Sequence, residues 1–386
     1  MGAARADGLV RARAGVTAIF FANGLCIGAW AVAIPEIKAL FGLSAARLSI
    51  VLLAAGVGGL AAMPVAGVLP PRIAGTGRAL RISGPLTALL LAALPLTHLL
   101  SSGIGFLAGC AFLFGFVNIL MDVPMNAHAS VVETRWGSAI MSSFHAAWSA
   151  GGLIGSAFGG LLIARGAGPG IQLGIEAGIA FAIAVAASLA IGVGDTRAAT
   201  RVFAVPERKL LALSLIAFLA VFAEGSVTDW SALYMSSEVG APSGAAAAAF
   251  SAYALMMIVG RLFGDRVVRA IGRTRVILYG AVLLFAGVAL ATGPLSEPGA
   301  VAGFALIGLG VANMVPAAFS ASAAAASSPS LGIAMSATMA YTSLLIGPPI
   351  FGAIATVSSL RLAFAMLLLA AAGIAALTAA QRGPAA

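Results

Sequence analysis

Charged residues are scarce in this sequence. Only 9% of its 386 residues are Asp, Glu, Lys or Arg, whereas a soluble domain carries about 25%. Apolar residues make up 61% of the chain. This balance excludes an ordinary soluble globular protein and predicts a chain that crosses a membrane many times. The 48 glycines agree with this, because small residues let membrane helices approach one another closely.

Cysteines and catalytic motifs are scarce as well. Cys26 and Cys110 are the two cysteines, and both lie within apolar runs, so we expect neither a disulfide framework nor a thiolate metal site. The sequence contains no His-Glu-x-x-His and no Gly-x-Ser-x-Gly, and the spacing of its Ser and His residues implies no nucleophile–base pair. We therefore expect no enzymatic activity, no metal and no cofactor.

The apolar residues fall into twelve runs, each close to the roughly 20 residues that a helix needs to cross the hydrocarbon core. The longest connection, 194–209, follows the sixth run and carries many charges. We therefore predict an all-α membrane protein with an N-terminal six-helix half over 1–193, a cytoplasmic inter-domain loop over 194–209 and a C-terminal six-helix half over 210–386. The runs are 14–36, 46–69, 79–98, 103–128, 138–163, 170–192, 210–235, 245–264, 274–293, 299–320, 332–356 and 360–380.

The basic residues predict the orientation. An even number of spans places both termini on one side of the membrane. If that side is the cytoplasm, only four of the 21 Lys and Arg residues lie on the outer side. They are Lys38, Arg47, Arg165 and Arg361. Short loops rich in Lys and Arg stay in the cytoplasm, so we expect both termini there. Because the net charge of +9 is spread over such loops, we expect no nucleic acid partner.

The two halves repeat in sequence, with each matching segment lying six spans after its counterpart. A parallel six-span repeat is typical of transporters that bind their substrate between pseudo-symmetric halves near the bilayer midplane. The pairs are Phe21–Gly24 with Phe222–Gly225, Gly67–Arg78 with Gly264–Arg275, and Met141–Ser142 with Met335–Ser336.

The segment Gly260–Arg266, followed by Gly272 and Arg273, resembles the loop motif of the major facilitator superfamily (MFS), and the whole chain resembles an MFS transporter. The resemblance implies the MFS fold and glycines that allow tight helix contact. In the first half Val68 stands where the motif has Asp, and Pro70–Pro71 interrupt the loop. The residues that the resemblance implies as a gating latch are Arg261, Asp265, Arg266 and Arg273.

Two further segments, Met125–His145 and Ala223–Trp230, resemble the YbjJ-like branch of bacterial inner-membrane proteins. That resemblance implies a location in the bacterial inner membrane, and we expect a monomer there. The glycines of Gly155–Gly160 resemble the antiporter motif of drug exporters, with Ser156 in place of the motif's Pro. Close helix packing is the other interpretation of these glycines.

Polar residues within the fourth run form one stripe. Asn118, Asp122 and Asn126 follow one another at intervals of four, which places them on one helix face. We expect the asparagines to bind substrate and Asp122 to exchange a proton. The Asp-x-x-x-Asn spacing also resembles the fourth helix of the proton-coupled fucose symporter group, with Ala127 where that group has Pro.

The fifth run adds Ser142, His145 and Trp148 as expected substrate contacts. Ser142 and His145 belong to a face that also carries Ser138, Ser149 and Ser156, and a packing role for this face is the alternative. Trp148 lies near the middle of its run, where an indole ring can stack on a flat solute. Trp230 lies near the outer end of the seventh run, where we expect an interfacial anchor.

Glu224 and Asp229 lie in the seventh run. At 100° per residue they point about 140° apart, and at 1.5 Å per residue from Lys209 they lie about 22 and 30 Å into the membrane. We therefore expect Asp229 to act at the outer gate. A carboxyl group shielded from water can exchange a proton near neutral pH, so we expect Glu224 to couple protons with Asp122. Thr228 shares the face of Glu224 and is an expected substrate contact.

Two asparagines complete the predicted site. Asn23 and Asn313 are expected substrate contacts. Glu176 lies near the outer end of its run, and we expect its side chain to reach the membrane interface. We expect no Lys or Arg deep within any run, which argues against anionic substrates, because these usually require a cation.

These observations predict a proton-coupled secondary transporter of a small neutral polar solute such as a sugar, working by alternating access. Proton-driven efflux of cationic or amphipathic drug-like compounds is the alternative. A channel does not require a repeat in two halves, and a receptor built on a transporter fold normally carries an added soluble domain, which is not visible here.

Overall fold

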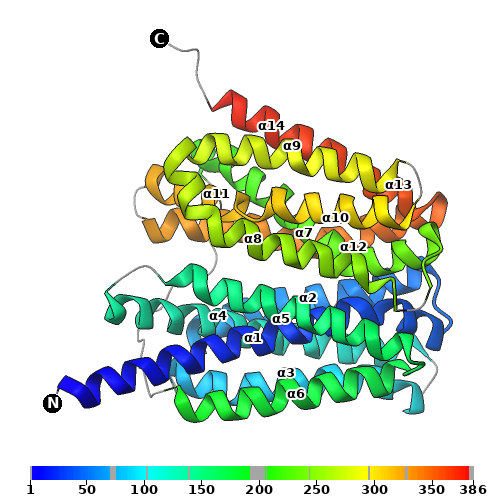
Figure 1. The fold of residues 1–386 in the computed structure, drawn as a ribbon, viewed down its shortest axis with the longest axis horizontal. Coiled ribbons are helices and arrows are strands. Elements are labelled where there is room, and N and C mark those ends of the chain that lie inside the picture. The colour runs from blue at the N-terminus through cyan, green and yellow to red at the C-terminus, as the bar shows by residue number, and fades with distance from the viewer. Residues whose placement is uncertain are drawn as a thin grey trace. The chain divides into compact units, whose positions relative to one another are not determined.

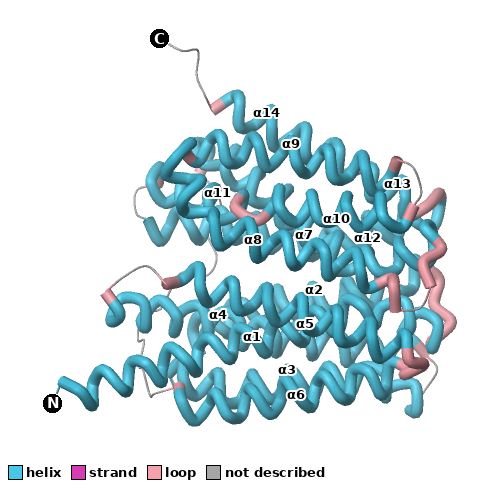
Figure 2. Tube along the Cα trace, viewed as in Figure 1, coloured by secondary structure: helices cyan, strands magenta, loops and turns pink. Residues whose placement is uncertain are grey.

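The structure is a computed structural model of the chain (Figure 1). It describes the residues in the ranges 2–69, 75–100, 103–137, 140–191, 205, 207–242, 244–293, 296–326 and 329–381. These residues are almost all helical, and none of them forms a strand (Figure 2). The helices are α1 Gly2–Leu40, α2 Ala45–Leu69, α3 Gly75–Leu100, α4 Ile104–Trp136, α5 Met141–Ala164, α6 Pro169–Ala190, α7 Leu211–Tyr234, α8 Ala247–Ile271, α9 Arg273–Thr292, α10 Glu297–Val311, α11 Met314–Ala325, α12 Pro329–Val357, α13 Leu360–Ala365 and α14 Leu367–Ala380.

Twelve helical segments of the described chain are long and apolar enough to cross a membrane, which confirms the predicted number. Two of these spans are each built from two helices. α10 and α11 together form the span Glu297–Ala325, and α13 and α14 form Leu360–Ala380. A helical turn of 3₁₀ type at Arg208–Leu210 precedes α7, and a π-helical turn at Met235–Val239 follows it.

Contacts within the fold divide the chain into two units. The N-terminal unit comprises Met1–Gly42 and Ala54–Thr200, and the C-terminal unit comprises Leu43–Leu53 and Arg201–Ala386. The loop predicted over 194–209 falls largely on residues outside the described ranges. The predicted boundary between the halves therefore stays a prediction.

Four helix pairs recur in the two units. In the N-terminal unit, α1 packs against α5 and α6, and α3 packs against α4 and α6. In the C-terminal unit, α7 packs against α12 and α14, and α9 packs against α10 and α14 (Figure 1). Because α12 and α14 lie in the eleventh and twelfth spans, each pair recurs six spans later. The repeat in sequence is thus also a repeat of helix packing.

Glycines bring α1 and α5 into backbone contact. A Cβ atom at Gly24 would lie 1.9 Å from the carbonyl oxygen of Trp148, and one at Gly28 would lie 2.2 Å from that of Gly152. From the other helix, a Cβ atom at Gly151 would lie 2.1 Å from the carbonyl oxygen of Phe21. Such distances exclude any side chain. Close packing therefore explains Gly24, Gly28 and Gly151, of which Gly151 lies at the start of the glycine-rich part of α5.

Gly28→Leu is accordingly expected to destabilise the N-terminal unit. The added side chain meets backbone atoms that cannot move without separating α1 from α5, and overpacking of this kind costs about 1–3 kcal/mol. The thermal unfolding temperature of the purified protein in detergent measures the effect. Gly174→Leu in α6 is the matched control, because nothing lies within 4 Å of a Cβ atom there. Equal unfolding temperatures for the two variants would contradict the packing argument.

Aromatic side chains fill the core of the C-terminal unit. Trp230 is 0% exposed and stacks on Phe351, with 6.0 Å between ring centroids. Tyr234, one turn later, packs against Phe364 and donates a hydrogen bond of 2.7 Å to the carbonyl oxygen of Ala291. The expectation of an interfacial anchor at Trp230 is therefore wrong. Hydropathy indicated its depth along the helix but not the direction of its ring.

A break divides the tenth span. α10 ends at Val311 and α11 begins at Met314. Pro316 lies four residues after Ala312, and a proline ring clashes with the carbonyl group four residues before it. The ring of Pro316 therefore explains the break, whereas α12 continues through Pro348 and Pro349. The break leaves Asn313 between two helices, where its side chain can contact α8.

Candidate functional site

Asn23 joins three helices of the N-terminal unit. Its side-chain amide donates to Asn118 Oδ1 of α4 at 2.7 Å, and its Oδ1 accepts a hydrogen bond of 2.8 Å from Trp148 Nε1 of α5. Asn23 is 2% exposed, whereas Asn118 and Trp148 are half-buried. Three residues predicted from separate runs thus form one network of uncharged hydrogen-bonding groups. We call it the Asn23 network.

Asp122 and Asn126 continue along α4 from Asn118. Both are half-buried, and Asn126 Nδ2 donates to Asp122 Oδ1 at 3.2 Å and to the Asp122 carbonyl oxygen at 3.0 Å. Within the described part of the chain, no Lys or Arg forms an ion pair with Asp122. This face of α4 therefore presents a carboxyl group that accepts a hydrogen bond from an amide. It has no basic partner in the described part of the chain.

Like Trp148, the other polar residues predicted on α5 are half-buried or buried where the structure describes them. His145 is half-buried and lies edge-on to Phe20, with ring centroids 5.3 Å apart. Ser149 and Ser156 are buried, and the Ser156 hydroxyl donates to the carbonyl oxygen of Leu153 in its own helix. The burial of these two serines agrees with the alternative of a packing role. The side chain of Ser142, and all of Ser138, lie outside what the structure describes.

In the C-terminal unit, Glu224 of α7 faces Arg261 of α8. Glu224 Oε1 lies 3.7 Å from Arg261 Nη2, and their side chains are 21% and 15% exposed. Arg261 lies in the last turn of the span Ala247–Gly264, so it does not contradict the expectation that no Lys or Arg lies deep within a run, yet its side chain is largely buried beside Glu224. A guanidinium group on a long flexible stem reaches well away from its own backbone position. The predicted gating residue is therefore the partner of the predicted proton-coupling residue.

Other side chains surround this pair on α7 and α8. The hydroxyl group of Thr228 donates to the carbonyl oxygen of Glu224 at 2.9 Å. Tyr253 lies two helical turns before Arg261 on α8, and its buried hydroxyl group has no hydrogen-bond partner among the described residues. Tyr253 was missed in the sequence, although its spacing of eight residues from Arg261 places both on one helix face. Asp229 is half-buried and has no ion pair in the described chain.

The rest of the predicted latch lies around the end of α8. Asn313 Nδ2 donates to the carbonyl oxygen of Gly260 at 2.8 Å, and a Cβ atom at Gly264 would lie 2.2 Å from Asn313 Oδ1. The motif glycines thus admit Asn313 from the break between α10 and α11. Arg266 lies over the ring of Phe263, Arg273 begins α9 in an exposed position, and the side chain of Asp265 is not described.

Glu176 is fully buried, so the expectation that it reaches the interface is wrong. Gln172 Nε2 donates to Glu176 Oε2 and, at 3.2 Å, to the carbonyl oxygen of Ala29. A Cβ atom at Gly159 would lie 2.9 Å from the carboxyl oxygen. A missing side chain on α5 therefore makes room for a polar pair from α6 that bonds to α1.

Groups that could hold a metal ion are absent from the described residues, where no three His, Cys, Asp or Glu side chains cluster. The polar features are instead the Asn23 network with Asp122 in one unit and the Glu224–Arg261 pair in the other. The first can bind an uncharged solute through hydrogen bonds. The second can respond to protonation, because neutralising the carboxylate removes the charge that Arg261 faces.

Comparison with known proteins identifies the class. No protein-family model matches the chain. An uncharacterised MFS-type transporter of Yersinia pestis is 34% identical over 356 residues, which cover 91% of each chain. An uncharacterised transporter of Sinorhizobium fredii is 32% identical over 94% of this chain and 96% of its own. The membrane protein MosC of Rhizobium meliloti is 32% identical over 92% of this chain and 86% of its own.

Solved structures agree in fold. The crystal structure of the nucleoside transporter NupG superposes with a TM-score of 0.73 and 13% sequence identity, over 96% of this chain and 99% of NupG. Its D323A mutant gives a TM-score of 0.75 and 13% identity, over 95% and 98% of the two chains. The relatives from Yersinia pestis and Sinorhizobium fredii and the structural neighbour NupG are transporters and not enzymes. The chain therefore belongs to the major facilitator superfamily of multi-pass membrane transporters.

Proposed function

We propose that this transporter carries a small neutral polar solute by alternating access and couples its movement to protons. The observation that carries the proposal is the Asn23 network, in which amide and indole groups from α1, α4 and α5 meet without a charged residue. Such groups recognise hydroxyl and carbonyl groups of a sugar-like solute. Nucleosides are a second class to test, because the structurally similar NupG is a nucleoside transporter.

The proposed proton-coupling residues are Asp122 and Glu224, one in each unit. Glu224 supports this role because its carboxylate faces Arg261 at 3.7 Å while part of its surface stays exposed. Protonation cancels the attraction between the two side chains and lets Arg261 move. Since the charge of Arg261 is balanced by Glu224, the pair does not require an anionic substrate. Asp229, Asp265, Arg266 and Arg273 are proposed to act in gating.

Most of the proposed substrate contacts belong to the N-terminal unit. Asn23, Asn118 and Trp148 form the network itself, and Asn126 lies beside it on α4. Of these, Trp148 can also offer a ring face to a flat solute. The other proposed contacts are Ser142, His145, Thr228 and Asn313.

Proton-driven export of cationic compounds is the second candidate. It is favoured by Asp122, a half-buried carboxyl group that has no basic partner in the described part of its unit. A cation could exchange with a proton at such a group. Everted membrane vesicles separate the two candidates. When a proton gradient is imposed, symport and antiport move the solute in opposite directions relative to the protons.

The proposed setting is the bacterial inner membrane, with a monomer whose termini are both cytoplasmic. The basic loops support this orientation through the positive-inside rule. Cysteine accessibility tests it. A cysteine introduced at Gly240, in the loop after α7, should react with an impermeant reagent added to intact cells. A reaction only in everted vesicles would reverse the orientation.

Trp148→Phe is expected to weaken the network while keeping an aromatic ring. The change removes the donor to Asn23 Oδ1, and an unsatisfied buried polar group costs about 1–3 kcal/mol. Thermal unfolding without solute and counterflow of the transported solute should both show the loss. Trp30→Phe is the control, because the Trp30 indole contacts Phe114 and has no hydrogen bond in the described chain. An equal loss in Trp30→Phe would contradict the assigned role.

A further inference from the structure

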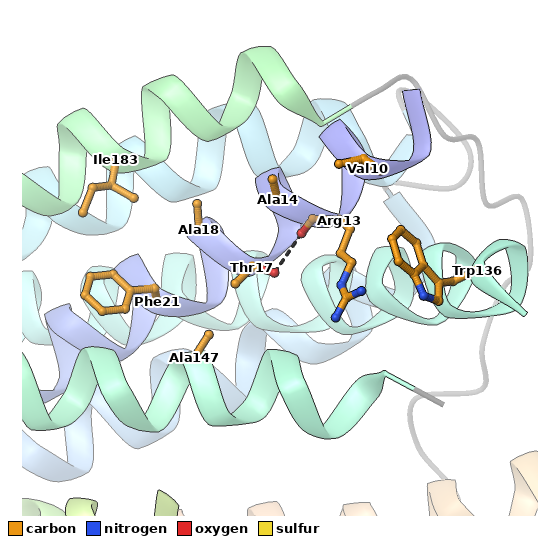
Figure 3. Close-up of a pocket in the computed structure, with 9 residues that line it drawn as sticks. All are labelled: Val10, Arg13, Ala14, Thr17, Ala18, Phe21, Trp136, Ala147 and Ile183. Atoms are coloured by element: carbon orange, nitrogen blue, oxygen red, sulfur yellow. Dashed lines mark hydrogen bonds between the residues drawn. The ribbon is translucent and has the colours of Figure 1, made fainter. Parts of the chain in front are cut away.

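A groove of about 560 Å³ lies along α1 in the N-terminal unit, and Figure 3 shows the residues that line it. Its wall is a stripe of α1 residues flanked by Ala147 of α5 and Ile183 of α6, and Trp136 of α4 closes one end. Phe21 belongs to this stripe, and Asn23, two residues later, points about 160° away on the helix. We call this cavity the α1 groove. The α1 residues that line it are Val10, Arg13, Ala14, Thr17, Ala18 and Phe21.

The α1 groove is charged at one end and apolar along the rest of its length. Among the described lining residues Arg13 is the one that carries a charge, and the others are almost entirely apolar. The hydroxyl group of Thr17 already donates to the Arg13 carbonyl oxygen at 2.8 Å, as Figure 3 shows. A neutral polar solute would therefore find few free hydrogen-bonding groups. The groove instead offers a cation at one end and an apolar trough beyond it.

Arg13 is held but not neutralised. Its guanidinium carbon lies 4.4 Å from the centroid of the Trp136 ring, which is cation–π geometry. Within the described chain, Arg13 forms no ion pair with a carboxylate. The indole face orients the guanidinium group and leaves its N–H donors for another acceptor. An anion is the complement of such a group.

Arg13 also lies at a suitable depth. α1 belongs to the candidate span Asp7–Leu40, and Arg13 lies in the second turn of that span. We expect a residue so near the end of a span to lie at the level of a membrane surface. Beyond it, Ala14, Ala18 and Phe21 extend toward the hydrocarbon core. Basic pockets between helices at this level suit anionic headgroups. A molecule with a phosphate at one end and an acyl chain at the other matches both parts of the groove.

We propose that the α1 groove binds one anionic phospholipid, with its phosphate on Arg13 and an acyl chain along Ala14, Ala18 and Phe21. Trp136 is a positioning residue that holds the guanidinium group toward the headgroup. With the proposed cytoplasmic N-terminus, the lipid comes from the cytoplasmic leaflet. A lipid bound here packs against α1, α5 and α6. Because α1 also carries Asn23, the lipid would affect the stability of the helix that forms the Asn23 network.

Native mass spectrometry with phosphatidylglycerol and phosphatidylcholine tests this proposal. The wild-type protein, released from detergent, should retain one phosphatidylglycerol in preference to phosphatidylcholine. Arg13→Gln should reduce that preference about fivefold, the effect of about 1 kcal/mol for one cation near an anionic surface. Arg11→Gln is the matched control, since Arg11 is exposed two residues away on α1 and does not line the groove.

A second variant keeps the charge and fills the trough. Ala14→Phe leaves Arg13 in place but occupies the path of the acyl chain, so it should lower phosphatidylglycerol retention as Arg13→Gln does. Equal retention of both lipids by the wild type would overturn the proposal, because it would show a groove indifferent to charge. Equal phosphatidylglycerol preference in Arg13→Gln and Arg11→Gln would overturn it as well, as would full retention in Ala14→Phe.

Discussion

Glu224→Gln is expected to abolish solute accumulation driven by a proton gradient, while exchange of solute across the membrane continues. Glutamine keeps the size and the hydrogen-bonding capacity of the side chain but cannot take up or release a proton. Arg261 then faces a neutral group at all times, as it does in the protonated state of the wild type. Reconstituted vesicles measure both activities, with accumulation under an imposed pH gradient compared with counterflow at equal pH.

The controls for this result follow from the Glu224–Arg261 contact. Glu297→Gln removes a carboxylate from the same unit at an exposed position at the start of α10, and it should leave accumulation unchanged. Glu224→Gln combined with Arg261→Gln removes the unpaired guanidinium charge. If counterflow is lost in Glu224→Gln and returns in the double variant, the unpaired charge of Arg261 caused the loss in the single variant. Normal gradient-driven accumulation in Glu224→Gln would exclude Glu224 as a coupling residue.

Asp122→Asn is expected to cause a comparable loss of proton-driven accumulation. The amide of Asn126 can donate to the oxygen of an asparagine as it does to Asp122 Oδ1, so the local structure of α4 should persist. The substitution removes only the group that can take up and release a proton. Accumulation and counterflow in reconstituted vesicles are the measurements. Asn126→Ala is the comparison, because it removes the hydrogen-bond donor and keeps the carboxyl group.

The comparison of these α4 variants separates coupling from binding. Asn126→Ala should weaken solute binding in counterflow and still accumulate solute under a gradient at a high solute concentration. Asp122→Asn should fail to accumulate at any solute concentration. If Asp122→Asn accumulated solute normally and Asn126→Ala did not, the acidic residue would serve only to hold the asparagine.

The helices and the repeat could be predicted from the sequence because they depend on features that a linear pattern contains. About 20 apolar residues suffice to define a span, and the recurrence of Phe21–Gly24 as Phe222–Gly225 placed the same turn in both halves. In the structure the third residue of that frame makes a polar side-chain contact to another helix in both units. Asn23 joins three helices, and Glu224 faces a cation.

The errors concern the direction of side chains across helix interfaces. Hydropathy shows how deep Glu176 and Trp230 lie, but their burial depends on the helices that they face. Glu176 is enclosed because Gly159 of a neighbouring helix leaves space for it. Arg261 was expected at a helix end because its motif lies there, and only the packing of α8 beside α7 brings it to Glu224. Such contacts require the relative rotation of two helices, which one sequence does not contain.

Internal pH is the most direct measure of the central claim, that solute and protons move together through a step that requires Glu224. The purified transporter is reconstituted into vesicles that contain a pH-sensitive dye, and panels of neutral sugars and nucleosides are added outside in turn. With a transported solute, the account predicts internal acidification in the wild type and none in Glu224→Gln. Solute uptake without any pH change, or acidification that persists in Glu224→Gln, would contradict it.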